Sequence, residues 1–343
     1  MRHGSALLQA IYSVPSALYY GVQKSRELAY RGGIFKGSRA PVPVLSVGNI
    51  LMGGSGKTPF AIFLARAAMR LGARPAIVSR GYKGTSRAPF LVVGDGRSPH
   101  PLVSPAVAGD EPWLMAWKLP DVPVLVGRKR IHPSTVAAEQ FGCDLVILDD
   151  GFQHLELHRD LDIVLVDGSE DRMFPRGRLR EPISALKRAD LVCFRGPGEI
   201  PGWRSLTAKP VFRYRVVPTG LRVGGEAASI QHPDIYASRE VVLVSGIANP
   251  DRFRKTAETL QWHVKDHLIF PDHHAFSESD LALIREDSPD TPKVFTEKDW
   301  VKLPDWFRRN PDVAALEVSV VMDDEAPFLQ WISAHASGRE GGR

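Results

Sequence analysis

Cysteine is scarce in this sequence, and its scarcity excludes whole classes of protein. Only Cys143 and Cys193 occur among 343 residues, and both stand in apolar runs. Cysteines in such surroundings are ordinarily small buried apolar side chains. A disulfide-rich secreted scaffold and a zinc site built on cysteine are therefore excluded, and nothing points to an oxidising compartment.

Long apolar runs are also missing, and the N-terminus comes closest to one. Its apolar residues recur at helical spacing at Leu7, Ile11, Val14, Leu18 and Val22. Polar residues and a proline interrupt the stretch, which is too short for a membrane span. With basic residues following, the pattern predicts an amphipathic helix over residues 1–35 that anchors the protein in the membrane interface. A helix packed on the core is the alternative.

Neither a large charge imbalance nor a low apolar content is present. Hydrophobic residues make up 43% of the chain and charged residues 24%, which excludes extensive disorder. The net charge of +5 favours anionic partners such as a phosphorylated lipid or an anionic membrane surface. Nucleic acid is not expected, because no arginine-rich tract interleaved with aromatics and no Cys/His finger spacing occurs.

Short apolar strands alternate with helical stretches, as in a parallel sheet covered by helices. The pattern predicts an α/β fold of the P-loop NTPase type, with a mostly parallel sheet and helices on both faces, including Pro59–Leu71 and Glu111–Trp117. The expected strands of this sheet are Val42–Val47, Pro75–Ser79, Pro123–Val126, Leu145–Leu148, Ile163–Val166 and Leu191–Phe194.

A change in pattern after residue 210 predicts a second, smaller α/β domain. Residues 211–217 alternate in polarity and a Pro-Thr-Gly turn follows, which indicates a hairpin linker over residues 211–225. The predicted organisation is thus an anchor helix (1–35), a P-loop domain (36–210), the linker, a second domain (226–335) and a disordered tail (336–343). In the second domain we expect strands at Val241–Ser245, Lys293–Thr296 and Leu316–Val321, and a helix at about Asn249–Leu260.

A glycine-rich loop joins the first predicted strand to a helix and indicates a nucleoside triphosphate site. Glycines allow backbone N–H groups to close on phosphate oxygens, and the helix N-terminus adds its own donors. Lys57 can then reach the β- and γ-phosphates, and the Thr58 hydroxyl can ligate Mg²⁺. Leu51 departs from the strict motif, which has glycine there. The loop residues expected to bind ATP are Leu51, Met52, Gly53, Gly54, Ser55, Gly56, Lys57 and Thr58.

Two carboxylates end another predicted strand, where ligands bind in open α/β sheets. Asp149 and Asp150 follow the apolar run Leu145–Leu148. Mg²⁺ prefers oxygen ligands and keeps several waters, so one carboxylate suffices. Because adjacent strand residues point to opposite faces, the two are not expected to share one role, and which of them touches the metal stays open.

Three further polar clusters have both chemical and structural interpretations. Basic residues lie in the segments 128–130 and 176–180, where arginines suit phosphoryl oxygens but also occur in solvated loops. Asp110 and Glu111 can cap and begin a helix without any chemistry. The Asp272-His273-His274 sequence suggests a His–Asp acid/base system more than a metal pair.

These pieces together resemble the tetraacyldisaccharide 4'-kinase family, the lipid A 4'-kinases of Gram-negative bacteria. The similarity covers nearly the whole chain, and the Leu51 departure belongs to the family's own loop pattern. The motifs occur in the family's order: GGSGKTP after APVPVLSVGN, SRGYKG, AGDEP, DDGFQH, RGRLREP, FPDHHAF and TEKDWVK.

The resemblance implies transfer of the ATP γ-phosphate to the 4'-hydroxyl of tetraacyldisaccharide 1-phosphate. The product is lipid IVA, a precursor in lipid A and lipopolysaccharide biosynthesis. It also implies a monotopic protein on the cytoplasmic face of the inner membrane, with ATP and Mg²⁺ as cofactors and no obligate protein partner.

By resemblance, Asp110 matches the family's catalytic aspartate and His273 the histidine of its D-H motif. Asp110 would accept the hydroxyl proton as transfer proceeds, with His273 assisting. Since Lys57 and His273 lie in different predicted domains, domain closure would assemble the site. Other positions that match the family's active site are Gln153, Arg130, Arg180 and Glu181.

Rival functions remain at this point. A P-loop GTPase or metallochaperone switch would carry an Asn/Thr-Lys-x-Asp tetrapeptide, but residues 296–299 read Thr-Glu-Lys-Asp. A dimeric partition or transport ATPase would have a second lysine early in the loop, which is absent. A non-catalytic scaffold would not be expected to keep Lys57, Thr58 and Asp149.

Overall fold

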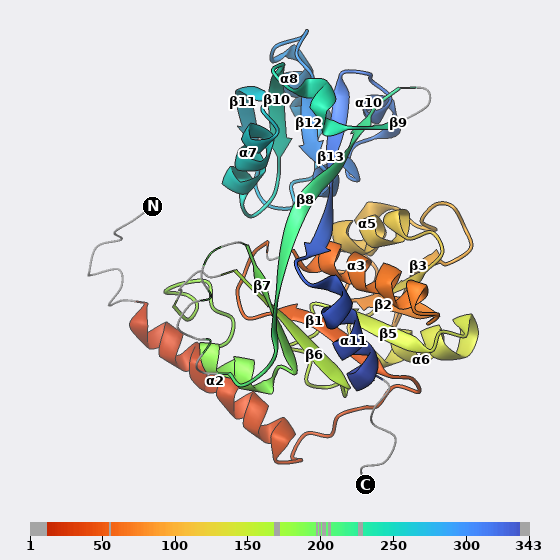
Figure 1. Cartoon of the computed structure of the whole chain (residues 1–343), viewed down its shortest axis with the longest axis vertical. Helices are drawn as coiled ribbons and strands as arrows, with labels where there is room; N and C mark the ends of the chain where they lie inside the picture. Colours follow the sequence, from red (N-terminus) through yellow and green to blue (C-terminus); the bar gives the residue numbers. More distant parts are fainter. Residues whose placement is uncertain are drawn as a thin grey trace.

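The structure, a computed structural model, describes residues 12–54, 56–167, 172–196, 198, 200, 204, 207–225 and 229–336. The described strands form one continuous mixed sheet that extends through two lobes (Figure 1). Its order is β11-β10-β12-β13-β8-β7-β6-β1-β5-β2-β4-β3, with β9 paired to β8.

The first lobe has a parallel sheet with an antiparallel edge strand, β3. Its strands are β1 (Val44–Asn49), β2 (Pro75–Ser79), β3 (Leu91–Asp95), β4 (Pro123–Val126), β5 (Leu145–Asp149), β6 (Leu161–Val166) and β7 (Leu191–Arg195). Its helices are α2 (Ser13–Arg31), α3 (Lys57–Arg70), α4 (Pro105–Ala108), α5 (Asp110–Lys118), α6 (Ile131–Phe141), the 3-10 helix η1 (Ile183–Arg188) and α11 (Glu325–Ala336).

Helices cover both faces of this sheet, as predicted. Along β1, Leu45 and Val47 pack in the core beneath α3, α5 and α11, whereas Val44 packs with α6 on the opposite face. The period of two that places alternate residues on opposite faces explains this division. All six predicted strands of the first lobe are present, with ends shifted by at most two residues.

The second lobe is a smaller α/β layer around β10 and β12. Its strands are β8 (Val211–Val223), β9 (Ser229–Gln231), β10 (Glu240–Ser245), β11 (His263–Ile269), β12 (Lys293–Thr296) and β13 (Val313–Met322). Its helices are the 3-10 helix η3 (Pro233–Tyr236), α7 (Pro250–Thr259), α8 (Glu278–Glu286), α9 (Glu297–Trp300) and α10 (Asp305–Arg308).

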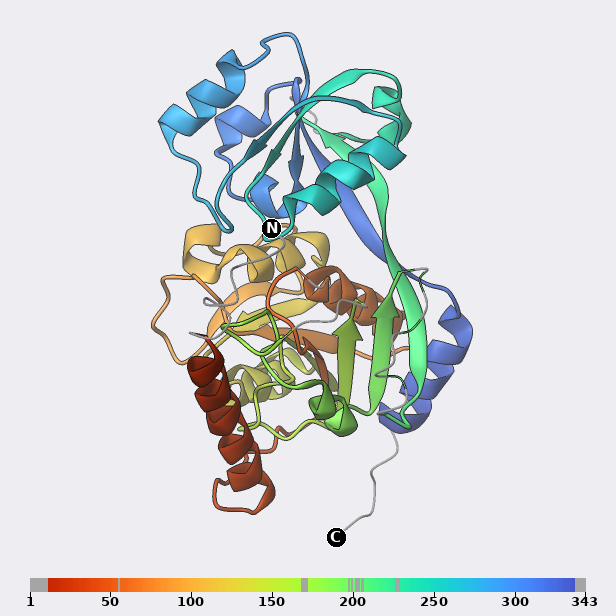
Figure 2. The ribbon, with the colours of Figure 1, turned by 90° about the vertical axis from the view of Figure 1, so that its left-hand side faces the viewer.

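The turn predicted within residues 211–225 is wrong. Strand β8 continues through Pro218, Thr219 and Gly220 and pairs antiparallel with β13, about ninety residues later. Pro218 is accommodated because the register shifts between Glu317 and Val318, beside its partner, so its missing N–H disrupts no regular ladder. A hairpin does occur, but between β8 and β9. Strands β8 and β13 form the only covalent passage between the lobes in the described chain (Figure 2).

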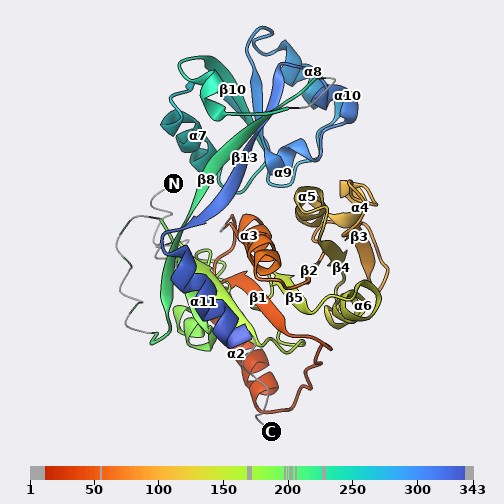
Figure 3. The same ribbon diagram turned by 45° about the vertical axis from the view of Figure 1, so that its right-hand side comes forward.

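The last helix returns to the first lobe. Helix α11 lies on the first lobe (Figure 3). Its Phe328 is fully buried, and the Phe328 ring lies 6.1 Å from that of Phe60 in α3. Part of the predicted range 226–335 therefore packs on the first lobe, and the division into domains stays a prediction. Ala336, the first residue of the predicted tail 336–343, still belongs to α11, and residues 337–343 lie outside the described residues.

Helix α2 buries polar side chains and exposes apolar ones. Its buried residues are Ser16 and Glu27, while Val14, Leu18 and Val22 are about two-thirds exposed. These three are four residues apart and form one stripe. Among the described residues, no helix combines the length and apolar character needed to cross a bilayer. The part of the predicted anchor before Tyr12 is not described.

Candidate active site

The phosphate loop runs between β1 and α3 at the carboxyl edge of the sheet. Gly56 has φ of 83°, in the left-handed region that favours glycine, and precedes the helix directly. Gly53 and Gly54 are exposed, whereas Leu51 is buried in a bridge with Leu179. The buried Leu51 side chain and its bridge to Leu179 thus fix the start of the loop. The predicted residue Ser55 lies outside the described residues.

Backbone hydrogen bonds join segment 172–181 to this loop. The Met52 N–H donates to the Arg178 carbonyl at 2.6 Å, and the Arg180 N–H donates to the Ile50 carbonyl at 2.8 Å. The arginine-rich segment is therefore fixed against the phosphate loop and is not a free solvated loop.

Lys57, Asp150 and Arg180 form an ion-pair cluster beside the loop. The Asp150 carboxylate lies 3.4 Å from Lys57 Nζ and 2.9 Å from Arg180 Nη1. Burial alone would raise the pKa of Asp150, but these two cations outweigh burial and hold the pKa at about 2. The cluster places two cations where phosphate oxygens would bind a P-loop.

Asp149 has the opposite environment. It is 1% exposed, and Oδ2 accepts a hydrogen bond from the Ser79 hydroxyl at 3.1 Å. Burial, followed by the negative charges of Glu111 and Asp150, raises the pKa of Asp149 to about 7. Its Oδ1 accepts no hydrogen bond from any described residue. This orphaned buried oxygen, ending β5 beside the phosphate loop, fits a cation ligand.

The donor set fits Mg²⁺ better than a metal held entirely by protein. No cluster of three or more acidic, histidine or cysteine side chains in the described part of the chain can hold a metal ion. Mg²⁺ binds through one or two protein oxygens, phosphate oxygens and waters. Asp149 and the Thr58 hydroxyl at the start of α3 suit this arrangement.

Arg130 lies near Asp150 of this cluster, and Gln153 contacts the end of β1. Burial, opposed by the negative charge of Asp150, lowers the pKa of Arg130 to about 10, so Arg130 remains charged at neutral pH. Its nearest described polar partners are the Arg128 carbonyl and His154 Nδ1, both at 3.5 Å. Gln153 donates to the Asn49 carbonyl at 2.8 Å and holds the end of β1.

Glu181 does not join this cluster. It is buried and pairs with Arg188 at 2.6 Å, and Arg188 also lies 4.4 Å from the centre of the Phe152 ring. Arg188 in turn reaches Glu27 of α2 at 3.7 Å. The predicted residue Glu181 therefore pairs with Arg188, which links it to α2, and its side chain is not part of the Lys57 cluster.

Asp110 and His273 meet across the two lobes. His273 Nδ1 lies 3.1 Å from Asp110 Oδ2, and both side chains are largely buried. The N-cap interpretation expected Asp110 to cap its helix, and this is wrong. Gly109 is the N-cap residue, and no side chain caps the helix. Gly109 has φ of 95°, and a Cβ there would lie 2.6 Å from the Tyr82 carbonyl, so only glycine allows this approach.

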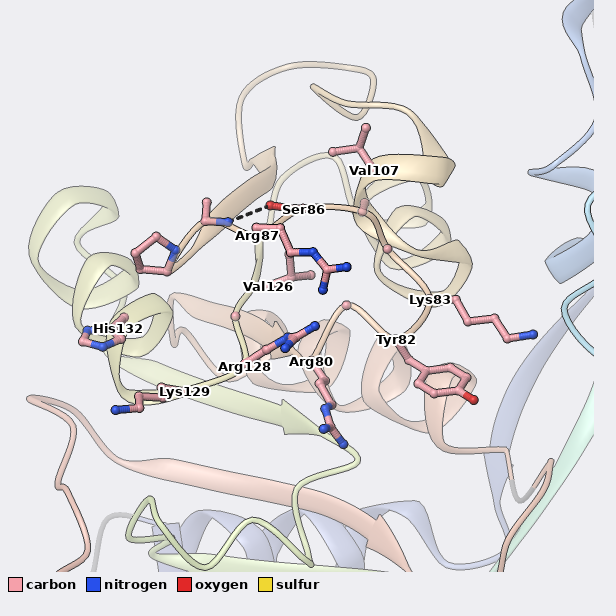
Figure 4. Close-up of a pocket in the computed structure, with 16 residues that line it drawn as sticks. Arg80, Tyr82, Lys83, Ser86, Arg87, Val107, Val126, Arg128, Lys129 and His132 are labelled. Carbon is pink, nitrogen blue, oxygen red and sulfur yellow. Dashed lines mark hydrogen bonds between the residues drawn. The ribbon is translucent and has the colours of Figure 1, made fainter.

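A basic cavity opens next to this pair. It has a volume of about 660 Å³ and lies between the loops that follow β2 and β4, with arginines from both loops around it (Figure 4). Its described lining includes no acidic residue, and its basic residues are Arg80, Lys83, Arg87, Arg128, Lys129 and His132. Arg80 and Lys83 belong to the SRGYKG motif, from which no role was predicted for them; their position at the carboxyl end of β2 was the available signal.

The second lobe also touches the phosphate loop. Arg252, in the first turn of α7, donates to the Gly54 carbonyl at 3.0 Å and lies 3.5 Å from Asp167 at the end of β6. No local pattern in the sequence indicates this contact, because Gly54 and Arg252 are 198 residues apart.

This arrangement can be compared with known proteins. The family model for tetraacyldisaccharide-1-P 4'-kinase matches residues 8–337. The chain belongs to the tetraacyldisaccharide 4'-kinase family.

Curated relatives agree in length and name. The tetraacyldisaccharide 4'-kinase of Desulfatibacillum aliphaticivorans is 38% identical, covering 96% of this chain and 93% of that protein. That of Syntrophus aciditrophicus is 40% identical, covering 87% of this chain and 84% of that protein. The "apo" form of LpxK from Aquifex aeolicus, solved in complex with ATP, matches with a TM-score of 0.79 and 34% identity, covering 96% of this chain and 99% of that one.

The GTPase alternative is not favoured. In the segment 296–299, Glu297 is buried against Lys118, and Asp299 accepts hydrogen bonds from the Gly246 N–H and the Thr296 hydroxyl. Glu297 thus pairs with a lysine of the first lobe, and Asp299 fixes the loop that follows β10. The relatives described above are kinases, and the tetrapeptide lacks the lysine that a GTPase motif would carry at position 297.

Proposed function

We propose that this kinase transfers the γ-phosphate of ATP to the 4'-hydroxyl of tetraacyldisaccharide 1-phosphate, giving lipid IVA, on the cytoplasmic face of the bacterial inner membrane. Family membership carries the proposal, together with one observation: Asp110 and Lys57 line the same carboxyl edge of the sheet. Glu111, the neighbour of Asp110, is close enough to raise the pKa of Asp149 at the end of β5.

The phosphate side of the reaction belongs to the first lobe. Lys57 and Arg180 would neutralise the phosphates, and Thr58 and Asp149 would hold Mg²⁺. When bound, Mg²⁺ would supply positive charge that offsets the negative charge of the phosphates. The Asp150 ion pair keeps Lys57 and Arg180 oriented before ATP binds, which lowers the reorganisation needed in the reaction.

The acceptor side belongs to Asp110 and His273. A sugar hydroxyl is too weakly acidic to be deprotonated in advance, so its proton passes to Asp110 while its oxygen bonds to the γ-phosphorus. The bond from that phosphorus to the β–γ bridging oxygen breaks, and ADP leaves. His273 supports the Asp110 carboxylate through the 3.1 Å contact.

The basic cavity suits the anionic sugar headgroup of the acceptor. Its lining continues through Val107 and Ala108, and only Gly109 separates Ala108 from Asp110 along the chain. A headgroup held by Arg80, Arg87 and Arg128 would therefore lie beside the base. We propose that its phosphate pairs with these arginines.

The acyl chains of such a substrate require a membrane, and α2 offers the surface. Its stripe of Val14, Leu18 and Val22 faces solvent, which in water costs free energy. Seated in the interface, the stripe would bury these side chains in lipid and leave the lobes above the bilayer.

The test is a product analysis with the full chain. The protein is incubated with ATP, Mg²⁺ and tetraacyldisaccharide 1-phosphate in mixed micelles, and the lipid is weighed by mass spectrometry. We expect the addition of one phosphoryl group at the 4' position, and its absence with Lys57→Met. An unphosphorylated lipid, or a stronger reaction with GTP than with ATP, would refute the proposal.

A further inference from the structure

Lys298 reaches the Asp110–His273 pair from the side opposite Asp110. It lies in the first turn of α9, and its Nζ is 3.0 Å from His273 Nε2. The same ammonium is 3.2 Å from Glu111 Oε1 and 3.6 Å from Asp272 Oδ1. His273 is thus held between Asp110 at one ring nitrogen and Lys298 at the other.

The chemistry of these partners fixes the proton on the ring. A lysine ammonium has donors and no acceptor, so Nε2 of His273 must accept from Lys298. Burial would lower the pKa of Lys298, but the charges of Glu111 and Asp272 outweigh it and raise the pKa, so the ammonium persists at neutral pH. A neutral imidazole that accepts at Nε2 carries its proton at Nδ1, where it donates to the Asp110 carboxylate.

We propose that Lys298 is a positioning residue that locks His273 in the Nδ1-protonated tautomer and thereby makes Asp110 the sole acceptor of the hydroxyl proton. This inference rests on the proposed roles of Asp110 and His273. With the ring donating to Oδ2, the other oxygen of Asp110 can accept from the substrate. A proton at Nε2 would point at the Lys298 ammonium 3.0 Å away, which has no acceptor, so Lys298 disfavours protonation at this nitrogen.

The other groups around His273 favour a ring that is protonated at both nitrogens. The described charged and titratable groups that face it are Asp110 and Glu111 from α5, Asp272 from its own loop, Lys298 from α9 and Tyr82, whose ring lies 5.4 Å away. Three of these five are carboxylates. Without Lys298 they would draw a second proton onto the ring, and Asp110 would pair with an imidazolium and become a weaker base.

The direct test is the nitrogen NMR spectrum of the full chain with ¹⁵N-labelled histidine. The His273 signals are assigned by their loss in His273→Gln. We expect a protonated Nδ1 and an unprotonated Nε2 in the wild type at pH 7. In Lys298→Met both nitrogens should be protonated at that pH. A wild-type spectrum with the proton on Nε2, or on both nitrogens, overturns the proposal whether or not any variant folds.

The kinetic test separates this role from simple lobe closure. In Lys298→Met, kcat at pH 7 should fall on the order of tenfold and recover as the pH rises, with KM for ATP unchanged. Lys298→Arg, which still donates to Nε2, should restore both tautomer and pH profile. Lys265→Met, a matched change at an exposed surface lysine, should match the wild type.

A purely structural role has a different outcome. In that case Lys298→Met would lower kcat equally at every pH and leave the tautomer of His273 unchanged, which overturns the proposal. Since the tautomer is measured without turnover, an inactive wild type with the expected tautomer would refute the proposed function alone.

Discussion

At the scale of single residues, two neighbouring carboxylates illustrate how position decides chemistry. Asp149 ends β5 inside the sheet, while Asp150 adopts a positive φ of 51° and turns its side chain toward Lys57 and Arg180. One carboxylate therefore has its pKa raised to about 7 and the other has it lowered to about 2. The sequence predicted different roles for the pair, but only the three-dimensional surroundings distinguish them.

Asp110→Asn tests the proposed base. The amide keeps the size and the contact with His273 but cannot take up a proton. We expect kcat to fall on the order of a hundredfold or more, while KM for ATP changes little. Steady-state kinetics at saturating acceptor measures both, with Asp234→Asn at an exposed site as the control. An unchanged kcat would show that another group accepts the proton.

His154 provides a test of pH-dependent stability. Burial, with the nearby charge of Arg130, lowers its pKa from 6.5 to about 3 in the folded protein. The unfolded chain then binds more protons, so stability is complete above the unfolded pKa of 6.5 and is lost as the pH falls toward 3. Between pH 7.5 and 5 the wild type should lose about 2 kcal/mol more unfolding free energy than His154→Gln.

Urea denaturation at the two pH values measures this difference. Other titrating groups contribute equally to both proteins and cancel in the comparison. Equal losses in wild type and variant would mean that His154 is protonated in the folded state.

At the scale of elements, segment 172–181 joins the proposed membrane helix to the phosphate loop. On one side the Ser16 hydroxyl donates to the Met173 carbonyl at 2.9 Å, and the Tyr19 and Phe174 rings lie 5.6 Å apart. On the other side Leu179 pairs with Leu51. The two proposed surfaces, one for lipid and one for ATP, are thus separated by a single packed segment.

The stripe on α2 should determine membrane affinity. Leu18→Ser with Val22→Ser removes apolar area without touching the buried face of the helix. Binding to vesicles with anionic lipid should weaken by about 2 kcal/mol or more, roughly thirtyfold. Co-sedimentation measures the change, with Leu283→Ser and Ile269→Ser as matched changes at exposed apolar residues of the second lobe. Equal weakening by both pairs would contradict a membrane face on α2.

Elements with local signals were predictable from the sequence, and elements defined by distant partners were not. The first-lobe strands read as apolar runs of four or more residues with turn signals between them. Strand β11 has only half-buried and exposed residues, so it shows no apolar run. The course of β8 through Pro218 depends on β13, and a proline with glycine nearby indicates a turn when that partner is unknown.

The site was predictable to a similar degree. Lys57, Thr58, Asp149 and Asp150 carry their chemistry in short motifs with known spacing. The contacts of Arg252 with the phosphate loop and of Lys298 with His273 come from other parts of the chain. No local pattern indicates them, because the tertiary fold alone brings these groups together.

At the scale of the whole molecule, α5 joins the lobes at both of its ends. Its N-terminus carries Asp110 and Glu111, which meet His273 and Lys298. Its C-terminus carries Lys118, which is buried, pairs with Glu297 and lies 3.4 Å from Glu317. Figure 3 shows the helix directly beneath α9. The proposed base therefore lies on a helix that contacts the second lobe at both of its ends.

Lys118→Met should destabilise the molecule and loosen the lobes. The change leaves Glu297 buried without its cation and close to Glu317, which keeps only Arg222 as a partner. We expect a loss of about 3 kcal/mol in unfolding free energy, measured by urea denaturation. Lys265→Met should cost almost nothing, because that lysine is exposed. A loss no larger than that of Lys265→Met would show that the cluster does not hold the lobes.

The passage between the lobes has a mechanical consequence. A flexible loop would let two bodies drift apart freely, but here the connection is a hydrogen-bonded ribbon of β8 and β13 that belongs to both. Separating the lobes must bend or twist this ribbon. Each opening that admits a lipid headgroup or releases a product would strain the ribbon, and relaxation of that strain would bring His273 back onto Asp110.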